Sequence, residues 1–308
     1  MQVAKDAAAL AAALEGSRKA GKRIGLVATM GALHAGHSSL VRAARAKCDV
    51  VVASIFVNPT QFGPTEDLAA YPRDPDGDRM KLADWGCGVL FLPTVDTMYP
   101  AGTESVRVMP PAGLMERLCG PTRPVHFPGV LTVVLKLFQL VRPHAAFFGQ
   151  KDYQQWRVIA HMAADLLTGV EIVRCPTVRE ADGLAMSSRN AYLTPDQRAQ
   201  AVALSRALAA ALDRYRAGER DVAALRHSAM SMWLGLTEDE ADKPDLEYLE
   251  VLDGDTLAPV PRLDGAGVAA IAARVGKARL IDNAILSDDS DDLGLLDLTR
   301  GTLFSRLA

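Results

Sequence analysis

Short, mainly apolar runs separated by polar segments mark most of the first 177 residues. Runs of this kind are typical of strands buried on both faces of a parallel sheet. We predict such strands over 24–28, 50–57, 89–92, 145–148 and 170–173. Helical spacing of Leu40, Val41 and Ala44 follows the first run, and the segment 129–141 is apolar nearly all round, as in a buried helix. This alternation predicts an α/β protein with a Rossmann-like parallel sheet.

The pattern changes near Thr194. We predict helices over 195–215, with Thr194 as the N-cap, and over 221–236. Strands are predicted after these helices, over 246–252, 268–274 and 278–286. The sequence therefore predicts a Rossmann-like N-terminal domain over 1–177, a smaller α+β C-terminal domain over 178–286 that lies over the first, and an acidic tail over 287–308.

The first predicted strand runs directly into a glycine-containing loop and then a helix. Gly31 and Gly36 let a flat ligand approach the backbone closely, and Ser38 or Ser39 is the expected helix cap or first-turn residue. Such a junction collects free backbone N–H groups and the positive end of a helix dipole. The loop is therefore a candidate phosphate-binding site.

Two imidazoles, His34 and His37, lie in this loop. As a His-x-x-His pair they could ligate zinc, or they could be ordinary loop histidines. No Cys or His stands at a spacing that would complete a zinc site. The preceding strand and the glycine between the two histidines favour contact with a nucleotide phosphate.

Further candidate segments follow other predicted strands. Gln61 lies in a loop with two prolines after the second strand, where α/β sheets bind ligands. Lys151 supplies a point charge after the fourth strand, next to Asp152, which can cap the following helix. The polar segment 186–189 ends in Arg189, whose guanidinium can bind a phosphate through two hydrogen bonds.

Composition narrows the class of protein. The chain has 308 residues, of which 49% are hydrophobic and 23% charged, as in an ordinary globular protein. A net charge of −3 gives no general attraction to nucleic acid, and no apolar run is long enough to cross a membrane. The alanine-rich segment 7–14 fits a helix better than a signal-peptide core. The four cysteines are widely spaced, which indicates reduced thiols in a cytoplasmic protein.

Several motifs in one order resemble the pantothenate synthetase family of the nucleotidylyltransferase and class I synthetase superfamily. They are Thr-Met-Gly-Ala-Leu-His-x-Gly-His from Thr29, Phe-Val-Asn-Pro-x-Gln-Phe, Tyr-Pro-Arg, Arg-Pro-x-His-Phe, Phe-Phe-Gly-x-Lys-Asp-Tyr-Gln-Gln and Met-Ser-Ser-Arg-Asn. The resemblance covers about 21–286. It implies ATP-dependent condensation of (R)-pantoate with β-alanine through a pantoyl-adenylate, with release of AMP and pyrophosphate.

The resemblance also implies roles for individual residues. His37, His34, Lys151 and Arg189 match the catalytic positions, and Gln61 and Gln155 match the pantoate-binding amides, with Gln61 also contacting β-alanine. The positions that match the ATP-binding residues are Met30, Gly31, Ala32, Leu33, His34, Ala35, Gly36, His37, Gly149, Gln150, Lys151, Asp152, Val178, Met186, Ser187, Ser188 and Arg189. Magnesium is expected to accompany ATP without a fixed protein site. A cytoplasmic homodimer that binds neither nucleic acid nor membrane is expected.

Three positions depart from the family pattern: Cys119 replaces a Glu, Val125 replaces a Gly, and Gln150 replaces a frequent Glu. None is assigned to pantoate, but they put the orientation of Arg123 in question. Two alternatives stay open, an adenylyl transferase that leaves the nucleotide on its acceptor and a catalytically silent nucleotide-binding protein. The intact His34 and Lys151 argue against the catalytically silent protein.

Overall fold

The computed structural model describes residues 1–64, 66–237 and 243–288. By their internal contacts the residues form two compact units. The first consists of Met1–Met115, Cys119–Gly149 and Gln154–Cys175, and the second of Glu116–Leu118, Gln150–Tyr153 and the chain from Pro176 onward. The predicted domain boundary at residue 177 stays a prediction. The predicted acidic tail, 287–308, lies outside the described residues beyond Asp288.

Six strands among the described residues of the first unit form a parallel sheet, as predicted, in the order β1-β4-β3-β2-β5-β6. The strands are β1 Gln2–Ala4, β2 Ile24–Thr29, β3 Val50–Ile55, β4 Val89–Phe91, β5 Ala145–Gly149 and β6 Glu171–Cys175. The sequence analysis missed β1, which pairs with β4 at the edge of the sheet. The strand has only three residues, of which only Ala4 is buried, so it leaves no apolar run long enough to be noticed in the sequence.

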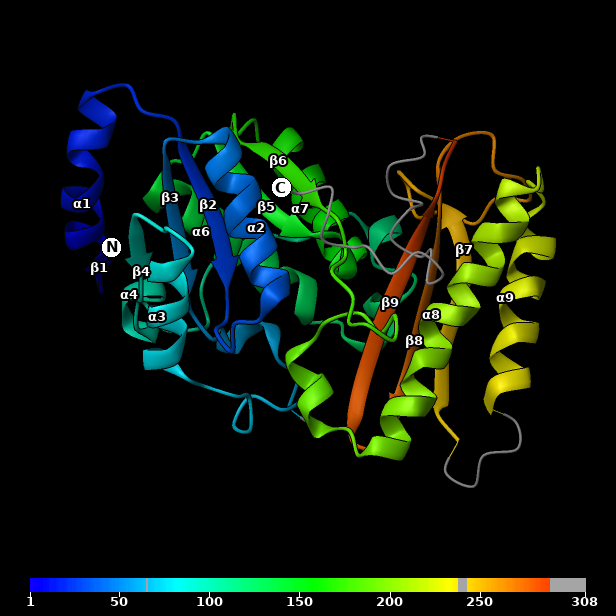
Figure 1. The fold of residues 1–308 in the computed structure, drawn as a ribbon. Coiled ribbons are helices and arrows are strands. Elements are labelled where there is room, and N and C mark those ends of the chain that lie inside the picture. The colour runs from blue at the N-terminus through cyan, green and yellow to red at the C-terminus, as the bar shows by residue number, and fades with distance from the viewer. Residues whose placement is uncertain (65, 238–242, 289–308) are drawn as a thin grey trace. The chain divides into compact units, whose positions relative to one another are not determined.

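Helices flank this sheet, with α2 in front of β2 and β5 in Figure 1 and α6 behind β2. Residues of α2 and α3 pack with alternate residues of the central strands in one hydrophobic core that includes Val27, Val41 and Phe147. The helices of the first unit are α1 Ala7–Lys19, α2 Ala35–Lys47, α3 Pro75–Asp84, α4 Val95–Met98, α5 Cys119–Thr122, α6 His126–Val141 and α7 Tyr153–Asp165, whose first residue belongs to the second unit. Twelve residues of α6 are buried, which confirms the prediction of a buried helix there.

The described part of the second unit holds an antiparallel sheet of three strands, β7 Asp245–Asp253, β8 Gly267–Val275 and β9 Ala278–Leu286. Two long helices, α8 Pro195–Arg216 and α9 Val222–Thr237, lie side by side and pack on this sheet (Figure 1). Alternate strand residues such as Ile271 and Leu280 form one core with both helices. Thr194 caps α8 as predicted, because its hydroxyl accepts a hydrogen bond from the backbone N–H of Gln197.

Candidate functional site

The strand order of the parallel sheet reverses between β2 and β5. From β2 the chain continues to β3 and β4 on one side, whereas β5 is followed by β6 on the other side. Open α/β sheets bind ligands outside the carboxyl ends of the strands at such a reversal. The chain leaves β2 after Thr29 and β5 after Gly149. The two segments predicted to bind nucleotide, 30–37 and 149–152, therefore start at the two neighbouring strand ends that flank the reversal.

The loop after β2 is held in an unusual backbone conformation. Gly31 and Ala32 have φ angles of 90° and 52°, in the left-handed region. Asp78 on α3 accepts hydrogen bonds from the backbone N–H groups of Ala32 (2.7 Å) and Leu33 (2.8 Å), and its side chain is buried. Lys81 donates to the carbonyl of Leu33 over 2.9 Å. The carboxylate of Asp78 therefore fixes the turn that leads into the two histidines.

His34 itself is the N-cap of α2, whereas the sequence favours Ser38 or Ser39 as the cap or first-turn residue. Its Nδ1 accepts a hydrogen bond from the backbone N–H of Gly36 at 3.2 Å, and its own backbone N–H donates to Nδ1 of His37 at 3.3 Å. The helix starts earlier than predicted because an imidazole takes the place of the usual hydroxyl or carboxylate acceptor. Ser38 and Ser39 lie within the helix, and the hydroxyl of Ser39 donates to the carbonyl of Gly36.

These hydrogen bonds also fix the form of both rings. Because a backbone N–H can only donate, Nδ1 of each imidazole is an acceptor, and a neutral ring carries its proton on Nε2. The two ring centres lie 4.3 Å apart with the planes inclined by 56°. A side chain at Gly36 would place its Cβ 2.9 Å from Cε1 of His34. The sequence His-x-Gly-His therefore supplies two neighbouring N–H donors, and the glycine makes room for the first ring.

Gln61 lies beside this loop, in the 3₁₀ turn Pro59–Gln61 after β3. Its Nε2 is 3.1 Å from the sulfur of Met30, and its Oε1 accepts a hydrogen bond from Nδ2 of Asn58 at 3.1 Å. Oδ1 of Asn58 accepts from the hydroxyls of Tyr99 (2.7 Å) and Thr60 (3.0 Å). These two hydroxyls face the oxygen of the Asn58 amide, so the NH₂ group of Asn58 faces Gln61. The amide oxygen of Gln61 must then face Asn58. Gln61 therefore turns its NH₂ group, the donor that suits a carboxylate, away from Asn58.

Helix α6 packs against the turn that carries Gln61. The carbonyl of Gly129 accepts a second hydrogen bond from Nδ2 of Asn58, and Nδ1 of His126 lies 3.2 Å from the carbonyl of Gln61. A Cβ at position 129 would lie 2.5 Å from the backbone oxygen of Thr60. Gly129 therefore permits a helix-to-turn contact that no other residue would allow.

The three departures from the family pattern have defined surroundings. Cys119 is buried, and its backbone N–H donates to Oε1 of Gln154 at 2.9 Å. Val125 precedes α6, and the nearby Arg123 makes two hydrogen bonds of 2.8 and 2.7 Å to the carboxylate of Glu66. The orientation of Arg123, in question from the sequence, is set by this bidentate pair. Gln150 is buried in the second unit.

The other predicted phosphate-binding residues belong to the second unit. The segment 178–186 forms a short hairpin, in which Arg179 and Ala185 make an antiparallel bridge and Met186 donates its N–H to the carbonyl of Val178 at 2.9 Å. The hairpin leads into a 3₁₀ turn at Ser188–Tyr192.

Ser187 begins that 3₁₀ turn as its cap. The hydroxyl of Ser187 accepts a hydrogen bond from the backbone N–H of Arg189 at 3.2 Å. Ser187, Ser188 and Arg189 are all partly exposed, so their side chains are accessible to a ligand. Lys151, in the 3₁₀ turn Gln150–Asp152, is partly exposed as well.

The predicted residues thus fall into two sets. Met30–His37, Gln61, Gly149 and Gln155, the last on α7, lie in the first unit, and within this set Met30 contacts Gln61. Gln150–Asp152, Val178 and Met186–Arg189 lie in the second unit. Sequence reasoning missed Asn58, Asp78 and Tyr99. Asp78 has several acidic neighbours in the sequence and no pattern distinguishes it, whereas Asn58 stands in a quoted motif but carried no predicted role.

Burial affects the titration of Tyr99. Removal from water raises the pKa of the Tyr99 phenol, and the hydrogen bonds with Thr60 and Asn58 offset part of this effect. The phenol therefore keeps its proton and stays a donor to Asn58.

Among the described residues, no group of three or more His, Cys, Asp or Glu side chains could hold a metal ion, and no helix is long and apolar enough to cross a membrane.

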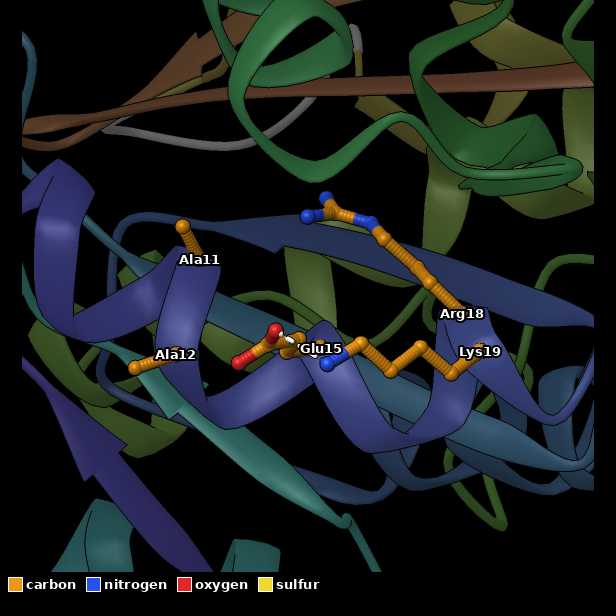
Figure 2. Close-up of a pocket in the computed structure, with 5 residues that line it drawn as sticks. All are labelled: Ala11, Ala12, Glu15, Arg18 and Lys19. Atoms are coloured by element: carbon orange, nitrogen blue, oxygen red, sulfur yellow. Dashed lines mark ion pairs between the residues drawn. The ribbon is translucent and has the colours of Figure 1, made fainter.

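A surface hollow along α1 lies apart from these residues in sequence and carries none of them. It is lined by Ala11, Ala12, Glu15, Arg18 and Lys19 (Figure 2). Glu15 and Lys19 form an ion pair, and Arg18 donates to the carbonyls of Leu140 and Val141 at the end of α6. The charged groups of the hollow are therefore engaged with the protein itself.

Comparison with known proteins gives a consistent result. The model of the family described as pantoate-beta-alanine ligase matches residues 2–285. A pantothenate synthetase of Moorella thermoacetica is 50% identical over 287 residues, 93% of this chain and 99% of that protein. A pantothenate synthetase of Thermotoga neapolitana is 50% identical over 272 residues, 88% of this chain and 95% of that protein.

Solved structures resemble the fold. A crystal structure of pantothenate synthetase from Thermus thermophilus matches with a TM-score of 0.86 at 42% identity, over 93% of this chain and 100% of that chain. A crystal structure of pantoate-beta-alanine ligase from Francisella tularensis, complexed with beta-gamma ATP and β-alanine, matches with a TM-score of 0.71 at 34% identity, over 92% of this chain and 97% of that chain.

Proposed function

Since the chain belongs to the pantoate-beta-alanine ligase family, we propose that it joins (R)-pantoate to β-alanine at the expense of ATP, through a pantoyl-adenylate. The observation that carries this proposal is the reversal of strand order between β2 and β5, with the His34–His37 loop starting at one strand end and the Lys151 turn at the other. The oriented amide of Gln61 lies beside the first of these segments.

The first step needs no general base. A carboxylic acid with a pKa near 4 is ionised at pH 7, so the pantoate carboxylate can attack the α-phosphorus of ATP directly. An oxygen–phosphorus bond forms, the bond from that phosphorus to the β-phosphate oxygen breaks, and pyrophosphate leaves with the electron pair. The protein must position the reactants and stabilise the departing charge.

We assign that stabilisation to two kinds of donor. His34 and His37 present Nε2–H groups, because both Nδ1 atoms accept backbone hydrogen bonds. Lys151 and Arg189 add positive charge, and Arg189 can bind two phosphate oxygens at once. The backbone N–H groups around residues 30–37, and Ser187 and Ser188, complete the proposed nucleotide contacts.

Gln61 and Gln155 are the proposed pantoate contacts. An amide NH₂ can orient a carboxylate without the strong ion pair that would weaken its attack. The fixed orientation of the Gln61 amide supports this role, because the hydrogen bond from Asn58 reserves its oxygen for the protein. In the second step the free amine of β-alanine attacks the carbonyl carbon of the adenylate. The carbon–nitrogen bond forms, the bond from that carbon to the phosphate oxygen of AMP breaks, AMP leaves with the electron pair, and the nitrogen loses one proton.

Magnesium would supply charge neutralisation at the ATP phosphates. The described residues contribute no three-residue cluster of usual metal ligands, so the nucleotide oxygens and water are the proposed ligands.

We also propose a homodimer in the cytoplasm, and light scattering of the purified protein tests the oligomeric state.

Isotope exchange tests the proposal most directly. Labelled pyrophosphate should enter ATP when pantoate and magnesium are present and β-alanine is absent, and omission of pantoate should abolish the exchange. Addition of β-alanine should yield pantothenate and one AMP per turnover. Exchange without any acid, or a nucleotidylated product, would indicate a transferase instead. Intact ATP binding without exchange would indicate a silent nucleotide-binding protein.

A further inference from the structure

Two neighbouring residues of β9, Asp282 and Asn283, hold both of the phosphate-binding segments predicted in the second unit. Asn283 is buried, and its Nδ2 donates to the backbone carbonyls of Gln150 at 3.0 Å and Lys151 at 2.9 Å. Both protons of one amide nitrogen thus fix two successive peptide groups. The backbone that carries Lys151 is therefore fastened to β9.

Asp282 holds the other segment. Its carboxylate makes two hydrogen bonds, of 2.6 and 3.0 Å, to the guanidinium of Arg179, and both side chains are only 2% exposed. Arg179 also donates to the carbonyl of Gly183 within the same hairpin at 3.1 Å. The hairpin that leads into Met186–Arg189 is therefore fastened to β9 as well.

The two attachments are coupled. Oδ1 of Asp282 accepts a hydrogen bond from the backbone N–H of Asn283 at 2.8 Å. Successive side chains of a strand point to opposite faces of the sheet, so one dipeptide can reach a partner on each side. A buried ion pair is a weak source of stability compared with apolar packing, so a role in fixing one geometry is the better explanation for this pair.

We propose that Asp282 and Asn283 are positioning residues, which hold the Lys151 turn and the Met186–Arg189 segment in one fixed geometry for the phosphates of ATP. The proposal rests on the proposed function, because Lys151 and Arg189 need this geometry only if they bind ATP. Neither β9 residue contacts the nucleotide in this proposal. The β9 strand of the C-terminal unit would then take part in adenylation through the backbone.

The size of the effect follows from the tolerance of catalysis to misplacement. A displacement of about 1 Å can cost ~10²-fold in rate. Replacement of Asn283 by Ala removes both donors and leaves two carbonyls without these partners. We expect pyrophosphate exchange to fall by about 10- to 100-fold and the KM for ATP to rise. The KM for pantoate should change by less than about twofold, because Gln61 is held by the separate Asn58 and Tyr99 contacts.

Variants of the full chain separate positioning from folding. Asn283→Asp keeps the shape and removes the donors, whereas Asn283→Ser keeps one donor and should recover part of the activity lost in Asn283→Ala. Arg279→Gln is the matched control, since Arg279 lies on the same strand and its guanidinium binds the carboxylate of Glu247 on β7. Melting temperature, exchange rate and both KM values are measured for each variant.

The expected result is a selective defect in ATP use for the Asn283 variants, partial recovery in Asn283→Ser, and near-normal exchange in Arg279→Gln. Normal exchange in a folded Asn283→Ala or Asn283→Asp variant would overturn the proposal, as would losses that simply follow melting temperature in all variants. If the unchanged protein shows no exchange, the proposed function has failed instead. Titration with a non-hydrolysable ATP analogue then decides the positioning role, because Asn283→Ala should still weaken binding.

Discussion

The hydroxyl of Tyr99 donates to Oδ1 of Asn58 at 2.7 Å, and through Asn58 it sets the orientation of the Gln61 amide. Tyr99 lies 41 residues from Asn58 in sequence and carries no predicted substrate contact. A residue remote from the motif thus controls which hydrogen-bonding group Gln61 can offer.

Tyr99→Phe should weaken pantoate use selectively. The change removes one donor to Asn58 while keeping the ring, so Asn58 and then Gln61 can rotate their amides. We expect the KM for pantoate in pyrophosphate exchange to rise about 5- to 20-fold, which corresponds to ~1–2 kcal/mol, the worth of one hydrogen bond. The KM for ATP should stay within about twofold. An equal rise in both KM values would contradict this role.

Asp78→Asn should disturb the loop that precedes the histidines. Asp78 accepts from two backbone N–H groups, and an amide offers one oxygen, so one N–H would face an NH₂ group. An unsatisfied buried donor costs about 1–3 kcal/mol. We expect a lower melting temperature and at least about a tenfold loss of exchange, since the loop shifts with it. Asp76→Asn, on an exposed position of the same helix, should leave both measurements unchanged. Similar effects of the two variants would argue against a specific role for Asp78.

His37→Ala and Arg189→Ala should each slow adenylation by ~10²-fold or more, the usual cost of one preorganised donor. Single-turnover assays of adenylate formation locate the loss in the first step. His227→Ala, on α9, is a control that should behave like the unchanged protein. Near-normal adenylation in His37→Ala would remove this residue from the proposed role.

Two thiols should resist alkylation. Burial raises the pKa of Cys87 to about 12 and that of Cys175 to about 11, so at pH 8 both stay protonated in the folded protein. Mass spectrometry after treatment with iodoacetamide should find them unmodified in the native state and modified in denaturant.

Cys119→Ser should keep activity within a few-fold, because the proposed chemistry uses no thiol. A large loss of activity in a folded Cys119→Ser protein would show that this thiol matters.

The Glu66–Arg123 pair predicts a pH dependence of stability. Burial would raise the pKa of Glu66, but the hydrogen bond and charge of Arg123 outweigh it, and the pKa is lowered overall. The unfolded chain therefore takes up the proton first as pH falls. The stabilisation is fully present above the ordinary pKa of Glu and is lost as pH falls through the folded-state pKa. The difference in melting temperature between the unchanged protein and Glu66→Gln should shrink between pH 7 and pH 3. A difference that stays constant across this pH range would contradict the prediction.

The sequence predicted those parts of the fold that leave a local pattern. The runs around Leu26 and Val52 are apolar because both faces of the sheet are covered, and Thr194 is a usual helix cap. The start of α2 was misplaced because His34 replaces the usual cap residues. Asp78 was missed because the two N–H groups that it binds lie 45 and 46 residues away in sequence. Tyr99 was missed because its partner Asn58 lies 41 residues away, so only the folded chain shows either role.

The hydrogen bonds of Asn283 also have a consequence for biosynthesis. A ribosome adds Lys151 to the chain 132 residues before it adds Asn283, and the nascent chain grows at about 5–20 residues per second. For at least several seconds the Lys151 turn therefore exists without the amide that holds its carbonyls. The β2 loop can meet Asp78 much sooner, since the two are separated by 45 or 46 residues. The two halves of the proposed ATP-binding machinery thus mature at different times, and the Lys151 half is completed only when β9 has been made.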